Sequence, residues 1–273
     1  MPDNGKLEIV GVTDVGRKRS HNEDYIGSDK EIGLAVLADG MGGYQAGEVA
    51  SAIAVETVMS ELRAGLKDIV PGEVDDETGY SKESLLIKAA IEKANQAIYQ
   101  TAQDKPECHG MGTTIVTVAF YENRLTVAHV GDSRLYRLRD GDFEQVTSDH
   151  SLLQELIDKG FYTPEEARKS LNKNLVTRAM GIELNVSPDL HEEFVKPGDI
   201  YLLCSDGLTD LVEDQEIAVI LRTCTDNLEE AGRRLVQKAN EYGGKDNISV
   251  ILARTLKTFT AKKTWVSKVF DWF

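Results

Sequence analysis

The spacing of apolar residues in the first hundred positions predicts strands followed by two long helices. Residues 7–13 alternate between polar and apolar side chains, and residues 33–38 form a short apolar run, which are both patterns of β-strands. Apolar residues over 46–62 recur at helical spacing. Ser81 is a suitable N-cap for a second long helix. The apolar face of that helix would contain Ile87, Ala90, Ile91, Ala94 and Ile98.

The rest of the chain is rich in strand patterns. Successive antiparallel strands are predicted at 113–120, 125–130, 134–138 and 143–146. Asp140-Gly141 separates the last two and is a strong signal for a two-residue hairpin turn. More polar residues over 152–168 predict two short helices, the second starting near Thr163-Pro164. A strand at 199–204, a helix at 228–242 and a strand at 248–253 complete the pattern.

This order of elements favours an α+β fold with two sheets in the core and helices outside. The chain has 273 residues, which is near the upper limit for one domain, and 41% of them are apolar. The net charge of −15 argues against binding to nucleic acid, which needs a basic surface. Three cysteines, a polar N-terminus and the lack of a run of about 20 apolar residues predict a cytoplasmic protein.

Acidic residues at five separate places give the first indication of chemistry. Glu23-Asp24, Asp39, Asp132, Asp206 and Asp246 each lie beside a turn signal, and most follow an apolar run. Carboxylates without His or Cys as immediate neighbours suit hard cations such as Mg²⁺ or Mn²⁺. Two such ions held together are a common means of attacking a phosphate ester.

Each of these acidic segments has a simpler interpretation when it is taken alone. Asp39-Gly40-Met41-Gly42-Gly43 could be a surface turn with a capping Asp, and an Asp before Gly or Asn is routine in turns. The alternative is that Asp39 bridges two metal ions while the glycines let a backbone carbonyl approach them.

Taken together, the segments are far more specific, and the series resembles the metal-dependent serine/threonine protein phosphatases of type 2C in their compact bacterial form. The resemblance covers residues 7–255. It rests on Arg19, Asn22-Glu23-Asp24, Asp39-Gly40-Met41-Gly42-Gly43, Gly112-Thr113-Thr114, Gly131-Asp132-Ser133-Arg134, Ser205-Asp206-Gly207-Leu208 and Asp246-Asn247, in this order and at this spacing.

The resemblance implies a central β-sandwich of two antiparallel sheets flanked by pairs of helices, in four layers. It implies two Mn²⁺ or Mg²⁺ ions per active site and a third, weaker ion. Asp39 would bridge the two ions, with Glu23 and the carbonyl of Gly40 completing the shell of one. Asp206 and Asp246 would hold the other ion, and Asp132 with Asp206 would hold the third.

The resemblance also implies how the reaction proceeds. Asp24 would orient a metal-bound water, and Arg19 would bind two phosphate oxygens with its planar fork. The metal-activated water would attack the phosphorus of phosphoserine or phosphothreonine directly, without a covalent phospho-enzyme. The segment 152–179 corresponds to the mobile flap of the family.

One position departs from the pattern of some family members, which have a His as general acid where this chain has Met41. His150 is a possible substitute, although a structural role beside a helix cap is the more favoured interpretation. A cysteine-based phosphatase is excluded, because none of the three cysteines is followed six residues later by Arg. A regulatory pseudo-phosphatase and a Ca²⁺-binding module stay as alternatives. The four metal-binding acids argue against the first, and the lack of an EF-hand loop argues against the second.

The expected partners are phosphoprotein substrates and, by the resemblance, a cognate Ser/Thr protein kinase. A phosphatase domain at 1–257 would be followed by a basic and aromatic tail at 258–273, and a monomer is the simplest expectation. Residues 261–273 contain both tryptophans and three lysines. They would pack on their own domain, dock on a partner or touch an anionic membrane surface.

Overall fold

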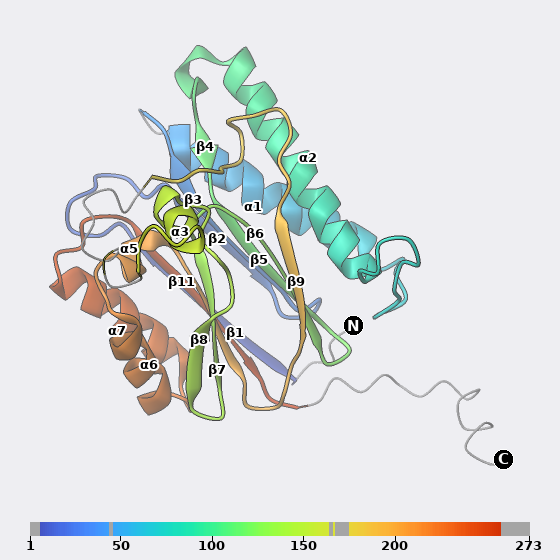
Figure 1. Ribbon diagram of the computed structural model, residues 1–273, viewed down its shortest axis with the longest axis vertical. Coiled ribbons are helices and arrows are strands. Elements are labelled where there is room, and N and C mark those ends of the chain that lie inside the picture. The colour runs from blue at the N-terminus through green and yellow to red at the C-terminus, as the bar shows by residue number, and fades with distance from the viewer. Residues whose placement is uncertain (1–5, 44–45, 164–165, 167–174, 258–273) are drawn as a thin grey trace.

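The computed structural model describes residues 6–43, 46–163, 166 and 175–257, and it contains two antiparallel sheets packed face to face (Figure 1). The five-stranded sheet has the order β1-β11-β10-β7-β8. Its strands are β1 (Leu7–Asp14), β11 (Ile248–Thr255), β10 (Ile200–Cys204), β7 (Arg134–Arg139) and β8 (Asp142–Gln145). The six-stranded sheet has the order β2-β3-β5-β6-β9, with β4 pairing with β3. Its strands are β2 (Asp24–Asp29), β3 (Leu34–Met41), β4 (Gly112–Thr113), β5 (Ile115–Tyr121), β6 (Arg124–Val130) and β9 (Asp189–Phe194).

Helices cover the outer face of each sheet (Figure 1). The two long helices α1 (Ala46–Gly65) and α2 (Lys82–Asp104) pack on the six-stranded sheet. Ser81 is the N-cap of α2, as predicted, and its side chain accepts a hydrogen bond from the Ser84 amide. On the other sheet lie α5 (Asp206–Thr209), α6 (Asp214–Thr223) and α7 (Leu228–Glu241). The turn η1 (Pro106–Cys108) follows α2, and α3 (Leu152–Asp158) follows the β7-β8 hairpin. The predicted four-layer α+β sandwich is confirmed.

Three hydrophobic layers hold the fold together, and the alternation of side chains along each strand assigns residues to them. Leu34, Val36 and Ala38 of β3 point toward α1 and α2, whereas Ala35 and Leu37 of the same strand point between the sheets. A third layer lies between the five-stranded sheet and helices α6 and α7. Every one of these β3 side chains is fully buried. Because both faces of the strand are covered, its sequence is a continuous apolar run.

Several predicted elements differ from the structure. The four predicted strands of the middle segment are not one meander, because β6 and β7 belong to different sheets. Gly131, at φ +106°, lies in the link between them. Strands β2 and β9 and helices α5 and α6 were not predicted. The hairpin turn at Asp140-Gly141 is confirmed, since both residues have positive φ. The second short helix after residue 158 falls largely outside the described residues.

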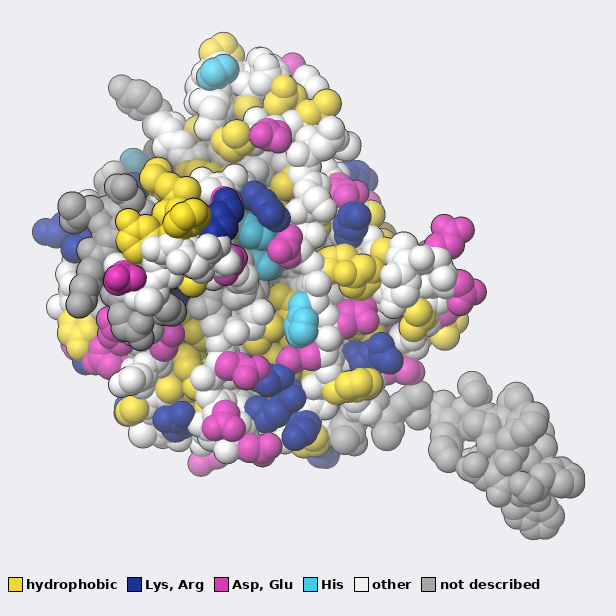
Figure 2. All heavy atoms as spheres, in the orientation of Figure 1, with side chains coloured by type: hydrophobic (Ala, Val, Ile, Leu, Met, Phe, Trp, Pro, Cys, Tyr) yellow, Lys and Arg dark blue, Asp and Glu magenta, His cyan; other side chains and the backbone are white. Residues whose placement is uncertain are grey.

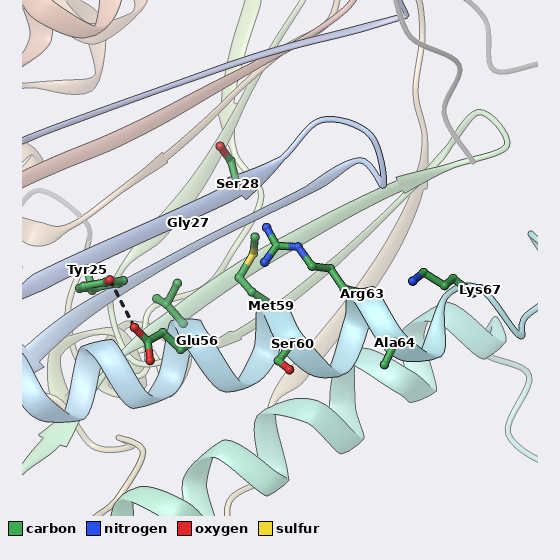
Figure 3. A pocket seen from close by; sticks show the side chains of 10 residues that line it. Tyr25, Gly27, Ser28, Glu56, Met59, Ser60, Arg63, Ala64 and Lys67 are labelled. Atoms are coloured by element: carbon green, nitrogen blue, oxygen red, sulfur yellow. Dashed lines mark hydrogen bonds between the residues drawn. The ribbon is translucent and has the colours of Figure 1, made fainter.

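A surface depression of about 560 Å³ lies between α1 and the edge strand β2 (Figure 3). Gly27 is one of its lining residues, and a Cβ at this position would stand 2.7 Å from Cγ1 of Val55. Arg63 crosses its far end and pairs with Asp29 at 2.8 Å. Within the described ranges, no helix is long and apolar enough to cross a membrane.

Candidate active site

Five aspartates from five separate segments meet at one edge of the sandwich, and we call them the carboxylate cluster. Asp24 opens β2 and lies directly opposite Asp39 of β3. The other three lie in the link between β6 and β7, at the first residue of α5, and just before β11. They are Asp132, Asp206 and Asp246. The pKa of Asp39 is raised well above its ordinary value, first by burial and then by the negative charges of the other four.

Close backbone packing at Gly40 determines where Asp39 lies. A Cβ at Gly40 would stand 2.2 Å from the carbonyl oxygen of Gly47 and 2.5 Å from that of Glu23, so only glycine fits. Thr114 binds Asp39 from the other side. Its hydroxyl accepts a hydrogen bond from the Asp39 amide at 3.1 Å, and its amide donates to the Asp39 carbonyl at 2.9 Å.

Asn247 joins the loop after β1 to the segment before β11. Its side-chain oxygen accepts a hydrogen bond from the Glu23 amide at 2.8 Å. Its side-chain nitrogen donates to the carbonyls of Val15 and His21 at 3.0 and 2.9 Å. One buried amide therefore places Glu23, and with it Asp24, next to Asp246. The sequence motif contained Asn247, but no function was predicted for it.

The electrostatic state of the cluster follows from burial and mutual repulsion. Burial raises the pKa of Asp24 to about 6, although a hydrogen bond from Ser205 at 2.9 Å opposes this. Burial and the charge of Asp149 raise the pKa of Asp132 to about 6. The pKa of Asp206 is raised well above its ordinary value by burial, by Asp132 and by Asp210. These carboxyl groups resist ionisation next to one another, so a cation among them would be strongly favoured.

Arg19 and Glu23 border the cluster. The Arg19 guanidinium donates one hydrogen bond to Asp246 at 2.7 Å, and about half of its side chain is exposed. This hydrogen bond is the main reason that the pKa of Arg19 is raised. Burial raises the pKa of Glu23, and Arg19 opposes that rise. The Glu23 carbonyl accepts hydrogen bonds from Gly40 and Ser51, which fixes the backbone on which this side chain is carried.

The residues present fit divalent cations. The side chains of the cluster offer carboxylate oxygens, which are the donors that Mg²⁺ and Mn²⁺ prefer. One of them, Oδ1 of Asp24, is buried without a hydrogen-bond partner among the described residues. An unpartnered buried carboxylate oxygen costs free energy unless a cation or a proton compensates it.

The structure brings together all the residues that were predicted to form the site: Arg19, Glu23, Asp24, Asp39, Gly40, Asp132, Asp206 and Asp246. The sequence motif contained Ser205, but no function was predicted for it, and Asp210 was missed. Asp210 lies one helical turn after Asp206, and its charge raises the pKa of both Asp206 and Asp132. The i, i+4 spacing of two aspartates was the available signal.

His150 has the structural role that was favoured for it. It is buried, its Nδ1 accepts a hydrogen bond from the Gly131 amide at 3.2 Å, and its Nε2 faces Asp189 at 3.3 Å. Ser151, not His150, caps α3. His150 is thus bound to the link that contains Asp132. Met41 lies at the end of β3, where it pairs with Gly112.

Two other sets of reactive side chains in the described residues do not form competing sites. His129, His150 and Asp189 bring three ligand-type atoms within 4.8 Å of one another. However, the Arg178 guanidinium already donates a hydrogen bond to Asp189 at 3.0 Å. Nδ1 of His150 accepts a hydrogen bond from the Gly131 amide, so the proton of the neutral ring lies on Nε2, which therefore has no lone pair for a metal ion. The three cysteines are buried, and burial raises the pKa of Cys204 to about 12, which makes it a poor nucleophile.

A two-sheet sandwich with an all-oxygen acidic cluster and an exposed arginine beside it has the design of a metal-dependent phosphatase. Comparison with known proteins gives the particular family. The model of the protein phosphatase 2C family matches residues 15–252. A putative protein phosphatase 2C-type of Streptococcus pyogenes serotype M6 is 39% identical over 249 residues, which are 90% of this chain and 96% of the relative.

Mycobacterium tuberculosis provides a second relative and its structure. The serine/threonine protein phosphatase PstP is 40% identical over 250 residues, which cover 90% of this chain but only 45% of PstP. A crystal structure of PstP/Ppp superposes with a TM-score of 0.80 at 37% identity, covering 92% of this chain and 99% of that one. Another structure, with a TM-score of 0.78, is the PstP catalytic domain in complex with two manganese ions.

The chain therefore belongs to the protein phosphatase 2C family. Its activity is that of the family, the metal-dependent hydrolysis of phosphoserine and phosphothreonine in proteins.

Proposed function

We propose that the carboxylate cluster is the site of this hydrolysis. Asp39 would bridge two Mn²⁺ or Mg²⁺ ions, with Glu23 and the Gly40 carbonyl completing the shell of one ion and Asp206 and Asp246 holding the other. Asp132 with Asp206 would hold a third, weaker ion. The observation that carries this proposal is the meeting of aspartates from distant segments, with Asp24 opposite Asp39 and a buried Asp24 oxygen that has no hydrogen-bond partner among the described residues. Bound cations would compensate the negative charges of these neighbouring carboxylates.

The remaining roles belong to Arg19 and Asp24. Divalent ions, when bound, would supply an activated water and neutralise charge on the phosphate. Arg19 donates to Asp246 through one nitrogen only, so its other N–H groups are available to hold phosphate oxygens. Asp24 keeps one oxygen on Ser205 and leaves Oδ1 to orient the water and accept its proton.

The leaving group also needs a proton, and Met41 cannot supply one. His150 is a poor donor for this purpose, because both of its ring nitrogens are engaged within the protein. We infer that the proton comes from solvent held at the site. This inference predicts that His150→Asn lowers Tm and leaves the pH dependence of kcat unchanged.

The test of this assignment measures hydrolysis of p-nitrophenyl phosphate and of a phosphothreonine peptide, with and without Mn²⁺. Turnover that requires Mn²⁺ and is lost in Asp39→Asn supports the site. Asp76→Asn is the matched control, because Asp76 is an exposed loop residue in which the same change should have no effect. Turnover by Asp39→Asn at more than about a tenth of the wild-type rate would contradict the assignment, since a bridging carboxylate cannot be replaced by a neutral amide.

Partners and location follow from the same assignment. We propose that the protein acts in the cytoplasm as a monomer and opposes a cognate Ser/Thr protein kinase, with residues 1–257 as the catalytic domain. The tail lies outside the described residues, and the contact predicted for 261–273 stays a prediction. Deleting 261–273 and measuring co-sedimentation with anionic vesicles tests the membrane contact, which an unchanged distribution would rule out.

A further inference from the structure

Three basic side chains lie beside the carboxylate cluster, and we call Arg17, Lys18 and Lys245 the basic rim. We propose that the basic rim selects phosphoprotein segments in which Asp or Glu residues flank the phosphorylated residue. This inference rests on the proposed function, because it assumes that the phosphorylated residue binds at the cluster.

The loop after β1 and the loop before β11 hold the basic rim together. They run side by side at one edge of the molecule (Figure 1). The amides of Arg17 and Lys18 both donate to the Gly244 carbonyl, at 2.7 and 3.2 Å. The Arg17 side chain packs against Gly244, since a Cβ there would stand 2.7 Å from Cγ of Arg17. These contacts hold the backbone of Arg17 and Lys18 against Gly244, the residue before Lys245.

The basic rim is adjacent in sequence and in space to residues that would bind the phosphate. Lys18 precedes Arg19, and Lys245 precedes Asp246, which pairs with Arg19 at 2.7 Å. Consecutive residues of an extended peptide are about 3.3–3.6 Å apart. Side chains one to three positions from the phosphorylated residue would therefore lie within reach of lysine and arginine side chains in the basic rim.

Among the residues that the structure describes, no ion pair uses the charges of the basic rim. Arg17, Lys18 and Lys245 are all exposed, and none of them forms an ion pair with a residue in the described ranges. Basic residues on the face in Figure 2 are different, because acidic and basic side chains are mixed over β7, β8 and β9. There, Arg137 pairs with Glu193, and Arg139 pairs with Asp199.

The positive charge of the basic rim contrasts with the negative charge of the whole chain. The chain has a net charge of −15, so an acidic peptide is repelled by most of its surface. Asp246, which follows Lys245 in the chain, pairs with Arg19. A group of three unpaired cations beside the site would reverse the potential locally and attract carboxylates next to the phosphorylated residue.

The test compares three phosphothreonine peptides of equal length, with Glu, Ala or Lys on both sides of the phosphothreonine. The rim variant is Arg17→Ala, Lys18→Ala and Lys245→Ala combined. The control variant removes the same charge from other exposed, unpaired positions through Lys30→Ala, Lys67→Ala and Lys105→Ala. The readout is the ratio of kcat/KM for the Glu peptide to kcat/KM for the Lys peptide, and turnover of p-nitrophenyl phosphate corrects for changes at the cluster itself.

We expect the wild type and the control variant to prefer the Glu peptide. The rim variant should lose about three- to tenfold of this preference, because exposed ion pairs contribute little individually and add up over three charges. High salt should reduce the wild-type preference in the same direction. An unchanged ratio in the rim variant, or an equal loss in the control variant, would overturn the proposal.

Binding measurements separate this proposal from the proposed function. Anisotropy of a labelled Glu peptide is measured on the Asp39→Asn protein with and without the rim substitutions. Weaker binding of the Glu peptide, but not of the Lys peptide, supports the basic rim even without turnover. Failure of wild-type protein to hydrolyse p-nitrophenyl phosphate with Mn²⁺ would contradict the proposed function alone.

Discussion

Asp24 and Asp39 face one another across neighbouring strands, which is an unfavourable position for two like charges. The arrangement is tolerated because their carboxyl groups share the cluster with cations or protons. Asp39, which we propose is needed for catalysis, should therefore lower the stability of the folded protein when the metal is absent.

This conflict predicts opposite effects of Asp39→Asn on activity and on stability. Turnover should be lost, as above. In EDTA at pH 8, however, the variant should melt at a higher temperature than the wild type, because one charge is removed from a repulsive cluster. A gain of 1 kcal/mol would raise Tm by roughly 2–4 °C for a domain of this size. A lower Tm, measured by differential scanning calorimetry, would show that Asp39 stabilises the metal-free fold instead.

Arg19 gives a second prediction at this scale. Arg19→Ala should mainly raise KM for p-nitrophenyl phosphate, since its free N–H groups would hold phosphate oxygens. Arg63→Ala is a suitable control, because Arg63 is equally exposed and also pairs with a single Asp. If Arg19→Ala leaves both KM and kcat unchanged, Arg19 does not contact the phosphate.

The sequence was most informative at the scale of residues. Each acid of the cluster could be predicted because it lies beside a turn signal and belongs to the series of motifs that resembles the family, and most of the acids also follow an apolar run. The residues that support them could not, because their partners are distant in the chain. Asn247, for example, binds Glu23 across a separation of 224 residues.

At the scale of elements, the side chain of Asn247 holds the loop after β1 against the segment before β11. Asn247→Ala removes three hydrogen bonds within a buried environment, and each unsatisfied partner costs about 1–3 kcal/mol. We expect both a lower Tm and a loss of kcat/KM of tenfold or more, since Glu23 and Asp246 would separate.

Asn227 provides the matched control for this prediction. Its side chain also accepts a backbone hydrogen bond, from Glu230 at the start of α7, but it lies away from the cluster. Asn227→Ala should cost about 1 kcal/mol as a lost helix cap and leave kcat/KM unchanged. Equal losses of activity in the two variants would show that Asn247 acts only through general stability.

The elements that were not predicted have separate physical explanations. β2 and β9 lie at the two edges of their sheet, and partly exposed strands there carry Gly27 or charged residues such as Glu192 instead of an apolar run. Helix α5 is a single turn, which is too short for a period to be visible. Helix α6 could have been found, because Ile217, Ala218 and Leu221 are buried on one of its faces.

The molecule as a whole should respond to pH differently with and without metal. In the metal-free fold, the pKa values of Asp24 and Asp132 are raised to about 6. The folded state therefore binds more protons than the unfolded chain between about pH 4 and 6, and this contribution to stability is lost as the pH rises through that range. Asp39 and Asp206 extend the loss to higher pH, because their pKa values are raised further.

Metal binding should reverse this trend, because cations bind the ionised carboxylates and displace their protons. We expect Mn²⁺ to raise Tm by more at pH 7.5 than at pH 5.5, relative to EDTA. Buried His129 and His150 have lowered pKa values and contribute equally in both conditions, so the difference between Mn²⁺ and EDTA isolates the carboxylates. A shift in Tm that does not depend on pH would contradict the protonation assigned to the cluster.

The overall sandwich could be predicted from the order of the elements together with the family resemblance. The division of β6 and β7 between sheets could not, because their sequences have the same strand pattern and only the glycine between them indicates a break. Pairing of distant strands is not visible in local periods.

The pairing of β1 with β11 has a consequence for how the protein is made. Thr13 and Ser249 bond to each other although 236 residues separate them, so the sheet closes only when nearly the whole chain is available. Asp246 comes from the same late segment. A chain still being synthesised on the ribosome therefore lacks a complete cluster until its last strand emerges. We therefore expect no dephosphorylation before β11 has emerged, and products truncated before β11 should be inactive without any separate inhibitor.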